Sequence, residues 1–178
     1  MKPTTRRSFL QTTGALAAFP FVGKVLGANE KLNIGVVGVA GRGGGNMRDV
    51  AAVKESHIAA LCDVDQKNLT AAAKQFPDAQ RYRDFRKMLE QKDLDAVVCS
   101  TPDHTHAIVG VSALKSGLHL YCEKPLAHTV TEVRALTEAA AKHKRVTQMG
   151  NQIHSGSNYR RVVELVQGGA IGDVREVH

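Results

Sequence analysis

Short apolar runs alternate with amphipathic stretches from residue 31 onward, and this alternation is the strongest constraint on the fold. Each apolar run is short enough to be a strand buried on both faces, and each stretch between them has the spacing of a helix. A chain of this kind forms a parallel sheet covered on both faces and joined by right-handed crossovers. We therefore predict strands at residues 32–39, 57–62, 94–100, 118–122 and 145–150, with a weak one at 81–82.

The stretches between these runs predict helices, and the last part of the chain predicts one more. Residues 157–167 have a helical pattern, followed by a glycine-rich turn and the first residues of another strand. We therefore expect one α/β domain over residues 31–150, and only the start of a second, α+β domain over residues 151–178. The helices of the first domain are predicted at residues 46–54, 66–75, 84–91, 104–116 and 131–143.

A glycine-rich segment, GVVGVAGRGGGNM at residues 35–47, follows the first predicted strand and opens a helix. From Gly38 to Gly43 it has the pattern G-x-A-x-x-G, with Ala40 where a dinucleotide-binding fingerprint prefers its middle glycine. Gly41 and its glycine neighbours keep the loop tight, so that its N–H groups and the helix N-terminus form a cradle for an anion. No Lys-Ser/Thr pair follows the last glycine, which argues against a nucleotide-hydrolysing loop. The segment predicts a Rossmann-type, doubly wound sheet that binds a dinucleotide.

Asp63 ends the second apolar run, 25 residues after Gly38. A carboxylate at this distance binds the hydroxyl groups of the adenosine ribose, and it would repel the 2′-phosphate of NADP. This favours NAD, while Arg42 leaves NADP open because it offers a cation in the loop. The alternative for Asp63 and Asp65 is that both cap the helix that begins at Gln66.

The first 28 residues are predicted to be a targeting segment and are excluded from the fold argument. The stretch TRRSFLQ at residues 5–11 is similar to a twin-arginine export signal, and residues 8–23 are uncharged but short for a membrane span. An uncleaved amphipathic anchor is the alternative. Four basic residues of this segment supply more than half of the formal charge of +7. With three Tyr and no Trp, the remaining chain does not have the composition of a nucleic-acid binder.

The cysteines and the clustered histidines do not predict a metal site. Cys62, Cys99 and Cys122 lie near the ends of apolar runs, without a C-x-x-C spacing, and are interpreted as buried, unpaired thiols. His104 and His106 have no acidic or Cys partner at helical ligand spacing. We interpret these histidines as facing solvent or the cofactor.

Three further segments follow predicted strands: STPDHTHA at 100–107, YCEKPLAHT at 121–129 and MGNQIHS at 149–155. Together with the glycine loop and CDVD at 62–65, in this order, they resemble the glucose–fructose oxidoreductase, inositol dehydrogenase and MocA family of NAD(P)-dependent oxidoreductases. The resemblance covers residues 32–155, and the EKP motif with the upstream TP-x-x-x-H is its most specific part.

The resemblance implies roles for several strand-end residues. Lys124 would lie beside the nicotinamide and the substrate hydroxyl, where an ammonium polarises the hydroxyl or relays its proton. Asn151 would face the sugar. Because successive strand residues point to opposite faces, Glu123 and Lys124 cannot both face the substrate while the strand persists. The residues that would contact the cofactor are Thr101, Pro102 and His106 at the nicotinamide ribose, and Glu123 on the cofactor side.

We therefore expect an exported oxidoreductase that transfers a hydride between NAD, or NADP, and a sugar or cyclic polyol. The twin-arginine export machinery would be a partner, the destination would be the periplasm, and a full-length relative would form a homo-oligomer. The chain looks truncated within its substrate domain. The alternative is a non-catalytic dinucleotide-binding module or assembly fragment.

Overall fold

The computed structural model describes residues 31–151, 154 and 156–177. The predicted export segment, residues 1–28, lies outside the described residues. None of the described helices has both the length and the apolar character needed to cross a membrane.

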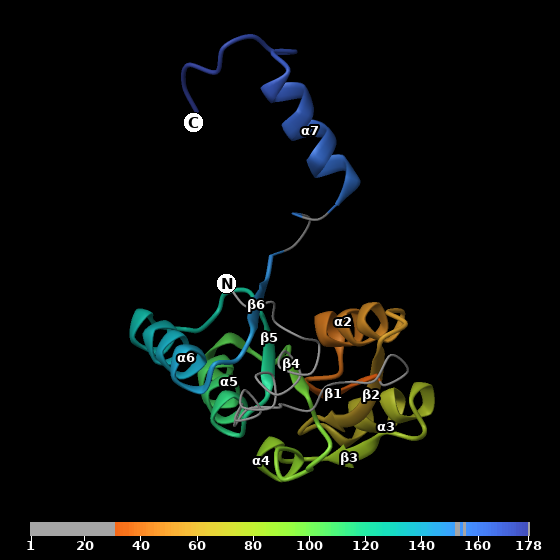
Figure 1. Cartoon of the computed structure of the whole chain (residues 1–178). Helices are drawn as coiled ribbons and strands as arrows, with labels where there is room; N and C mark the ends of the chain where they lie inside the picture. The colour runs from red at the N-terminus through yellow and green to blue at the C-terminus, as the bar shows by residue number, and fades with distance from the viewer. Residues whose placement is uncertain (1–30, 152–153, 155, 178) are drawn as a thin grey trace, which may run out of the picture. The chain divides into compact units, whose positions relative to one another are not determined.

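Six parallel strands form one sheet in the order β3-β2-β1-β4-β5-β6 (Figure 1). Sequence order reverses between β1 and β4, and in such sheets ligands bind at the carboxyl ends of the strands beside this switch point. The predicted doubly wound parallel sheet is confirmed, including the weak strand near residue 81. The strands are β1 Leu32–Val37, β2 Ser56–Cys62, β3 Gln80–Tyr82, β4 Ala96–Cys99, β5 His119–Glu123 and β6 Thr147–Gly150.

Helices cover both faces of the sheet, and each face has its own apolar core. One core joins the sheet to α2 and α3 through Met47, Leu69 and Ala72. The other joins it to α5 and α6 through Leu114 and Leu136. The helices are α2 Gly41–Ala51, α3 Gln66–Gln75, α4 Phe85–Met88, the 3-10 turn η2 Asp103–Thr105, α5 His106–Lys115, α6 Val130–His143 and, further along, α7 Ser157–Gln167.

The structure corrects several predicted boundaries. Helix α2 begins at Gly41, five residues before the predicted start, so four glycines, at positions 41, 43, 44 and 45, belong to the helix and not to a loop. Glycine has a low helix propensity, but the close approach of Gly43 to the Gly38 carbonyl oxygen, described below, leaves room only for glycine at that position. The helix predicted at 84–91 contains only α4, and the one at 104–116 begins as a 3-10 turn. No strand forms in residues 168–177, since strand backbone needs a partner for its hydrogen bonds.

Gly43 is the position where we expect an added methyl group to disrupt the fold most directly. An ideal Cβ on Gly43 would lie 1.8 Å from the carbonyl oxygen of Gly38, which is backbone and cannot rotate away. We predict that Gly43→Ala lowers the free energy of unfolding by about 3 kcal/mol, measured by urea denaturation.

Gly45→Ala is the matched control, because a Cβ on Gly45 would meet nothing closer than the Arg42 guanidinium at 3.8 Å. This variant should raise the free energy of unfolding by about 0.5–1 kcal/mol through its better helix propensity. Equal effects of the two variants would contradict the proposed backbone contact.

Candidate functional site

A cavity of about 690 Å³ lies at the carboxyl ends of β1, β2 and β4. Of the residues that the sequence predicted to bind a cofactor, Gly38, Ala40, Asp63, Thr101 and Pro102 line it. The other predicted cofactor residues do not line it: Gly41, Arg42 and Gly43 on α2, His106 on α5 and Glu123 on β5. The remaining lining residues, which the sequence did not single out for this site, include Val64, Asn68, Arg83, Phe85, Arg86 and Ile108.

The turn from β1 to α2 is closed by backbone contacts. Gly38 has a φ of +83°, and a Cβ there would lie 2.7 Å from the carbonyl oxygen of Ser100, so only glycine fits. Ala40 is the N-cap of α2 but provides no side-chain hydrogen bond, and the first turn of the helix holds no acidic residue. Apart from its chain neighbours and its own helix backbone, no atom of the described residues would lie within 4 Å of a Cβ on Gly41, so this side of the turn is open in the described structure. Free helix N–H groups behind an open glycine surface fit a pyrophosphate.

Asp63 joins the end of β2 to this turn. Its Oδ2 accepts a hydrogen bond from the Val39 N–H at 3.0 Å, and its Oδ1 accepts one from the Asp65 N–H at 2.9 Å. Asp65 is the residue that caps α3, through the Lys67 N–H at 2.7 Å. The sequence left open that both carboxylates cap α3, and the structure gives this role to Asp65. Asp65 caps the helix, while Asp63 is held in a fixed orientation at the wall of the cavity.

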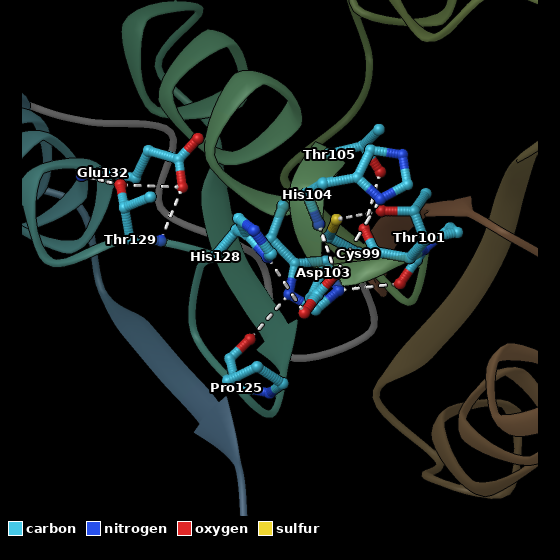
Figure 2. Close-up of polar contacts among 11 residues, drawn as sticks. Cys99, Thr101, Asp103, His104, Thr105, Pro125, His128, Thr129 and Glu132 are labelled. Carbon is cyan, nitrogen blue, oxygen red and sulfur yellow. Dashed lines mark hydrogen bonds and ion pairs between the residues drawn. The ribbon is translucent and has the colours of Figure 1, made fainter.

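His106 is almost fully buried, and both of its ring nitrogens face backbone carbonyl oxygens. One lies 2.8 Å from the carbonyl of Thr101 and the other 2.7 Å from that of Pro125. Thr101 and Pro125 belong to the turns after β4 and β5 (Figure 2). His106 therefore links these two turns from behind, rather than lining the cavity as a solvent-facing or cofactor-facing residue. On the surface, His128 and Asp103 make a second link between them, at 3.4 Å.

All three cysteines are buried and unpaired, as predicted. Cys99 and Cys122 are partners in the register of β4 and β5, and with His106 their ligand atoms lie within 4.8 Å of one another. Interaction with the neighbouring Cys122 thiol, helped by the Thr101 hydroxyl, lowers the pKa of Cys99 against the effect of burial. The same interaction and burial raise the pKa of Cys122. Both nitrogens of His106 already lie at hydrogen-bond distance from backbone carbonyl oxygens, which would have to move to admit a metal. The absence of a metal stays a prediction.

Glu123 ends β5 and is buried, with a relative exposure of 5%. Its Oε1 accepts hydrogen bonds from Asn46 Nδ2 at 2.8 Å, Arg42 Nε at 3.2 Å and the Tyr121 hydroxyl at 3.3 Å. Its Oε2 accepts one from the Lys124 N–H at 3.3 Å. Burial acts to raise the pKa of Glu123, but the hydrogen bonds from Asn46 and Arg42 outweigh it, and the pKa lies below its ordinary value of 4.5. Glu123 is therefore a buried anion that fixes α2 against β5.

Two residues of this network were not recognised from the sequence. Asn46 also donates a hydrogen bond to the Ser100 hydroxyl at 3.0 Å, and so reaches the turn after β4. A Cβ on Gly150 would lie 2.8 Å from Glu123 Oε1, so glycine at the end of β6 leaves room for the carboxylate. Only the tertiary arrangement brings these residues to Glu123, which lies 77 residues from Asn46 in the chain.

Lys124 and Asn151 are exposed residues that follow β5 and β6. Glu123 and Gly150 are partners in the register of these strands, so the next residue of each lies at the same carboxyl edge of the sheet. The Lys124 ammonium takes part in no ion pair within the described part of the chain. Glu123 is buried and Lys124 is exposed, so the two side chains do not face the same way, while their roles toward a substrate stay predictions.

Comparison with known proteins points to the same region of the chain as these motifs. The model of an oxidoreductase family with an NAD-binding Rossmann fold, the Gfo/Idh/MocA family, matches residues 32–151. This chain belongs to that family. Its motifs and sheet order are those of the NAD-binding domain.

Two relatives and one solved structure illustrate the similarity. An inositol 2-dehydrogenase of Salmonella paratyphi B is 30% identical over 150 residues, which are 83% of this chain and 45% of the relative. A glycosyl hydrolase family 109 protein of Shewanella pealeana is 27% identical over 168 residues, covering 89% of this chain and 37% of the relative. The scyllo-inositol dehydrogenase of Lactobacillus casei, solved with NAD(H) and scyllo-inositol, is 27% identical with a TM-score of 0.74, covering 81% and 43%. The chain spans less than half the length of these proteins.

We predict that Glu123→Gln lowers the free energy of unfolding at neutral pH by about 2–4 kcal/mol. The amide removes the charge and places a donor among groups that already donate. Because the pKa of Glu123 is lowered in the folded state, its contribution is present above its ordinary pKa of 4.5 and is lost as the pH falls through the folded value. Urea denaturation at several pH values should show a weaker loss of stability in acid for the variant than for the native chain.

Glu132→Gln is the control for this charge change. Glu132 accepts a hydrogen bond from the Thr129 N–H in the capping box of α6, a role that glutamine also fills, so its effect should stay within about 0.5 kcal/mol. If the free energy of unfolding fell with acid pH equally in the Glu123 variant and the native chain, this carboxylate would not stabilise the fold through its charge.

Proposed function

We propose that this chain provides the cofactor-binding half of an oxidoreductase that transfers a hydride between NAD and a cyclic polyol or sugar. The observation that carries the proposal is the exposed Lys124, which forms no ion pair among the described residues, at the carboxyl ends of the strands of an NAD-binding sheet, beside Asn151 on the neighbouring strand end. Inositol 2-dehydrogenases and a scyllo-inositol dehydrogenase among the similar proteins support the substrate class.

The proposed roles follow from where the residues lie. Bound NAD supplies the hydride acceptor. The α2 N-terminus behind Gly41 would hold the pyrophosphate, and Asp63 would accept hydrogen bonds from the adenosine ribose. Thr101 and Pro102 would shape the nicotinamide end of the cavity, while His106 positions their turn from behind.

Lys124 would act on the substrate hydroxyl. Oxidation of an alcohol removes a hydride from carbon and a proton from oxygen, and the Nζ of Lys124 would polarise the hydroxyl and help to remove the proton. Asn151 would donate or accept a hydrogen bond at a neighbouring hydroxyl of the substrate.

A second candidate activity is glycoside hydrolysis that uses NAD, favoured by the family 109 relatives that cover most of this chain. A dehydrogenase accumulates NADH in proportion to the polyol consumed, whereas such a hydrolase releases a sugar without net NADH. Incubation with NAD and either free inositol isomers or aryl glycosides separates the two activities.

We predict that Lys124→Ala leaves NADH binding within about twofold of the native value but lowers polyol-dependent NADH formation by about 100-fold or more. Lys142→Ala is the control, because Lys142 lies in the last turn of α6, which leads into the start of β6, whereas Lys124 follows the end of β5; this variant should change neither quantity. Unchanged turnover in the Lys124 variant would contradict its catalytic role. NADH binding without polyol turnover in the native chain would favour the non-catalytic dinucleotide-binding or assembly module.

We also propose that residues 1–28 direct export through the twin-arginine machinery to the periplasm, and that a full-length relative is a homo-oligomer. Replacement of both Arg6 and Arg7 by Lys should abolish export, because the paired guanidinium groups define this signal, while Lys24→Gln should not. Cell fractionation and immunoblotting measure the distribution. Unchanged export of the double variant would contradict the proposal, and light scattering of a full-length relative tests its oligomeric state.

A further inference from the structure

Cys99 and Cys122 form a pair of buried thiols that the proposed hydride transfer does not use. They are partners in the register of β4 and β5 and belong to the same apolar core. Register partners point to the same face of a sheet, and neighbouring strands lie about 4.8 Å apart. A disulfide spans Cα atoms that are about 4.4–6.8 Å apart. The two Sγ atoms already lie within 4.8 Å of each other, so the backbone permits a bond between them.

Cys62, the third cysteine, is separated from this pair by a whole strand. It pairs with Val37 on β1, and Val37 pairs on its other side with Cys99. Cys62 and Cys99 are thus two strand spacings apart, roughly 9–10 Å, which exceeds the span of a disulfide. The folded sheet therefore selects one of the three possible cysteine pairs.

The two thiols of the pair differ in acidity. The neighbouring thiol and the Thr101 hydroxyl, which lies 3.4 Å from Cys99 Sγ, lower the pKa of Cys99 (Figure 2). Interaction with Cys99 and burial raise the pKa of Cys122. The thiolate is the form of cysteine that attacks an oxidant, and an adjacent thiol can then displace the oxidised group. Cys99 therefore suits the attacking role, and Cys122 suits the second.

Thr101 connects the pair to the cavity, because it lines the cavity wall and its hydroxyl contacts Cys99 Sγ. Cys99 and Cys122 are themselves fully buried, which excludes direct attack by a protein disulfide. Hydrogen peroxide is small and uncharged, so it needs only a local opening of the turn beside Thr101 to reach the sulfur.

We propose that Cys99 and Cys122 close to an intramolecular disulfide when a peroxide oxidises the folded chain. The Cys99 thiolate attacks one peroxide oxygen and becomes a sulfenic acid. The O–O bond breaks, and the other oxygen leaves as hydroxide and takes up the proton that Cys99 released. The Cys122 sulfur then attacks the sulfenic sulfur, and its proton leaves with the displaced hydroxyl group as a second water. The two sulfurs lose two electrons in all, and the peroxide gains them.

Oxidation of the full, reduced chain with hydrogen peroxide tests this pair, followed by alkylation in denaturant and peptide mapping by mass spectrometry. Two of the three cysteines should lose their reactivity toward iodoacetamide, and only Cys62 should remain alkylated. The peptides that carry Cys99 and Cys122 should be joined, and dithiothreitol should separate them. A sulfinic or sulfonic acid on Cys99 with Cys122 still free would overturn the proposal, as would disulfides between separate chains.

Cys62→Ala is the matched control, because it removes the thiol that lies one strand too far away. This variant should form the same link and retain no free thiol. The native chain oxidised in urea is the second control. Links that include Cys62 should appear there, because the sheet no longer holds the cysteines in register. The same distribution of links in the folded and the unfolded chain would overturn the proposal.

Discussion

The buried carboxylate of Glu123 is the interaction on which the candidate site depends. It joins β5 to α2, which follows β1, and through Asn46 the network continues to the turn after β4. These elements surround the point where sequence order reverses in the sheet. A buried anion is stable only when its hydrogen-bond acceptors are satisfied, so Glu123 requires its donors to stay in place. The dinucleotide cradle and the strand end with Lys124 are thereby held in one fixed relation.

The sheet could be predicted from the sequence because its strands are buried on both faces. Such strands need continuous apolar runs, as in Val36–Val37 and Val97–Val98, and the pattern does not depend on knowing their partners. Helix α2 could not be placed in the same way. Residues 41–45 contain four glycines, which propensity assigns to a loop, yet Gly43 packs against the Gly38 carbonyl. Local propensity was overruled by a contact that exists only once β1 and α2 are folded together.

Site residues that belong to a local sequence motif could be predicted, whereas residues that reach the site through the pairing of neighbouring strands could not. Gly38 and Asp63 belong to a motif with fixed spacing, and both lie where the motif implies. Arg83 follows a three-residue strand that the sequence indicates only weakly, and its place beside Asp63 follows from the pairing of β2 with β3. His106 shows the opposite case, because its segment was recognised but its side chain turned inward. Whether a histidine faces a cavity or binds two carbonyl groups depends on the turns around it.

The arrangement of charges at the end of β5 explains how neighbouring residues of opposite sign can serve different purposes. Glu123 and Lys124 would neutralise each other if both side chains faced the same solvent. Instead the carboxylate points inward and receives three side-chain hydrogen bonds, while the ammonium is exposed. The Lys124 backbone N–H, and not its ammonium, donates a hydrogen bond to Glu123 Oε2. Because Asn46 and Arg42 satisfy the anion, the ammonium of Lys124 is left without a carboxylate partner in the described chain, which is the state that its proposed role toward a substrate hydroxyl requires.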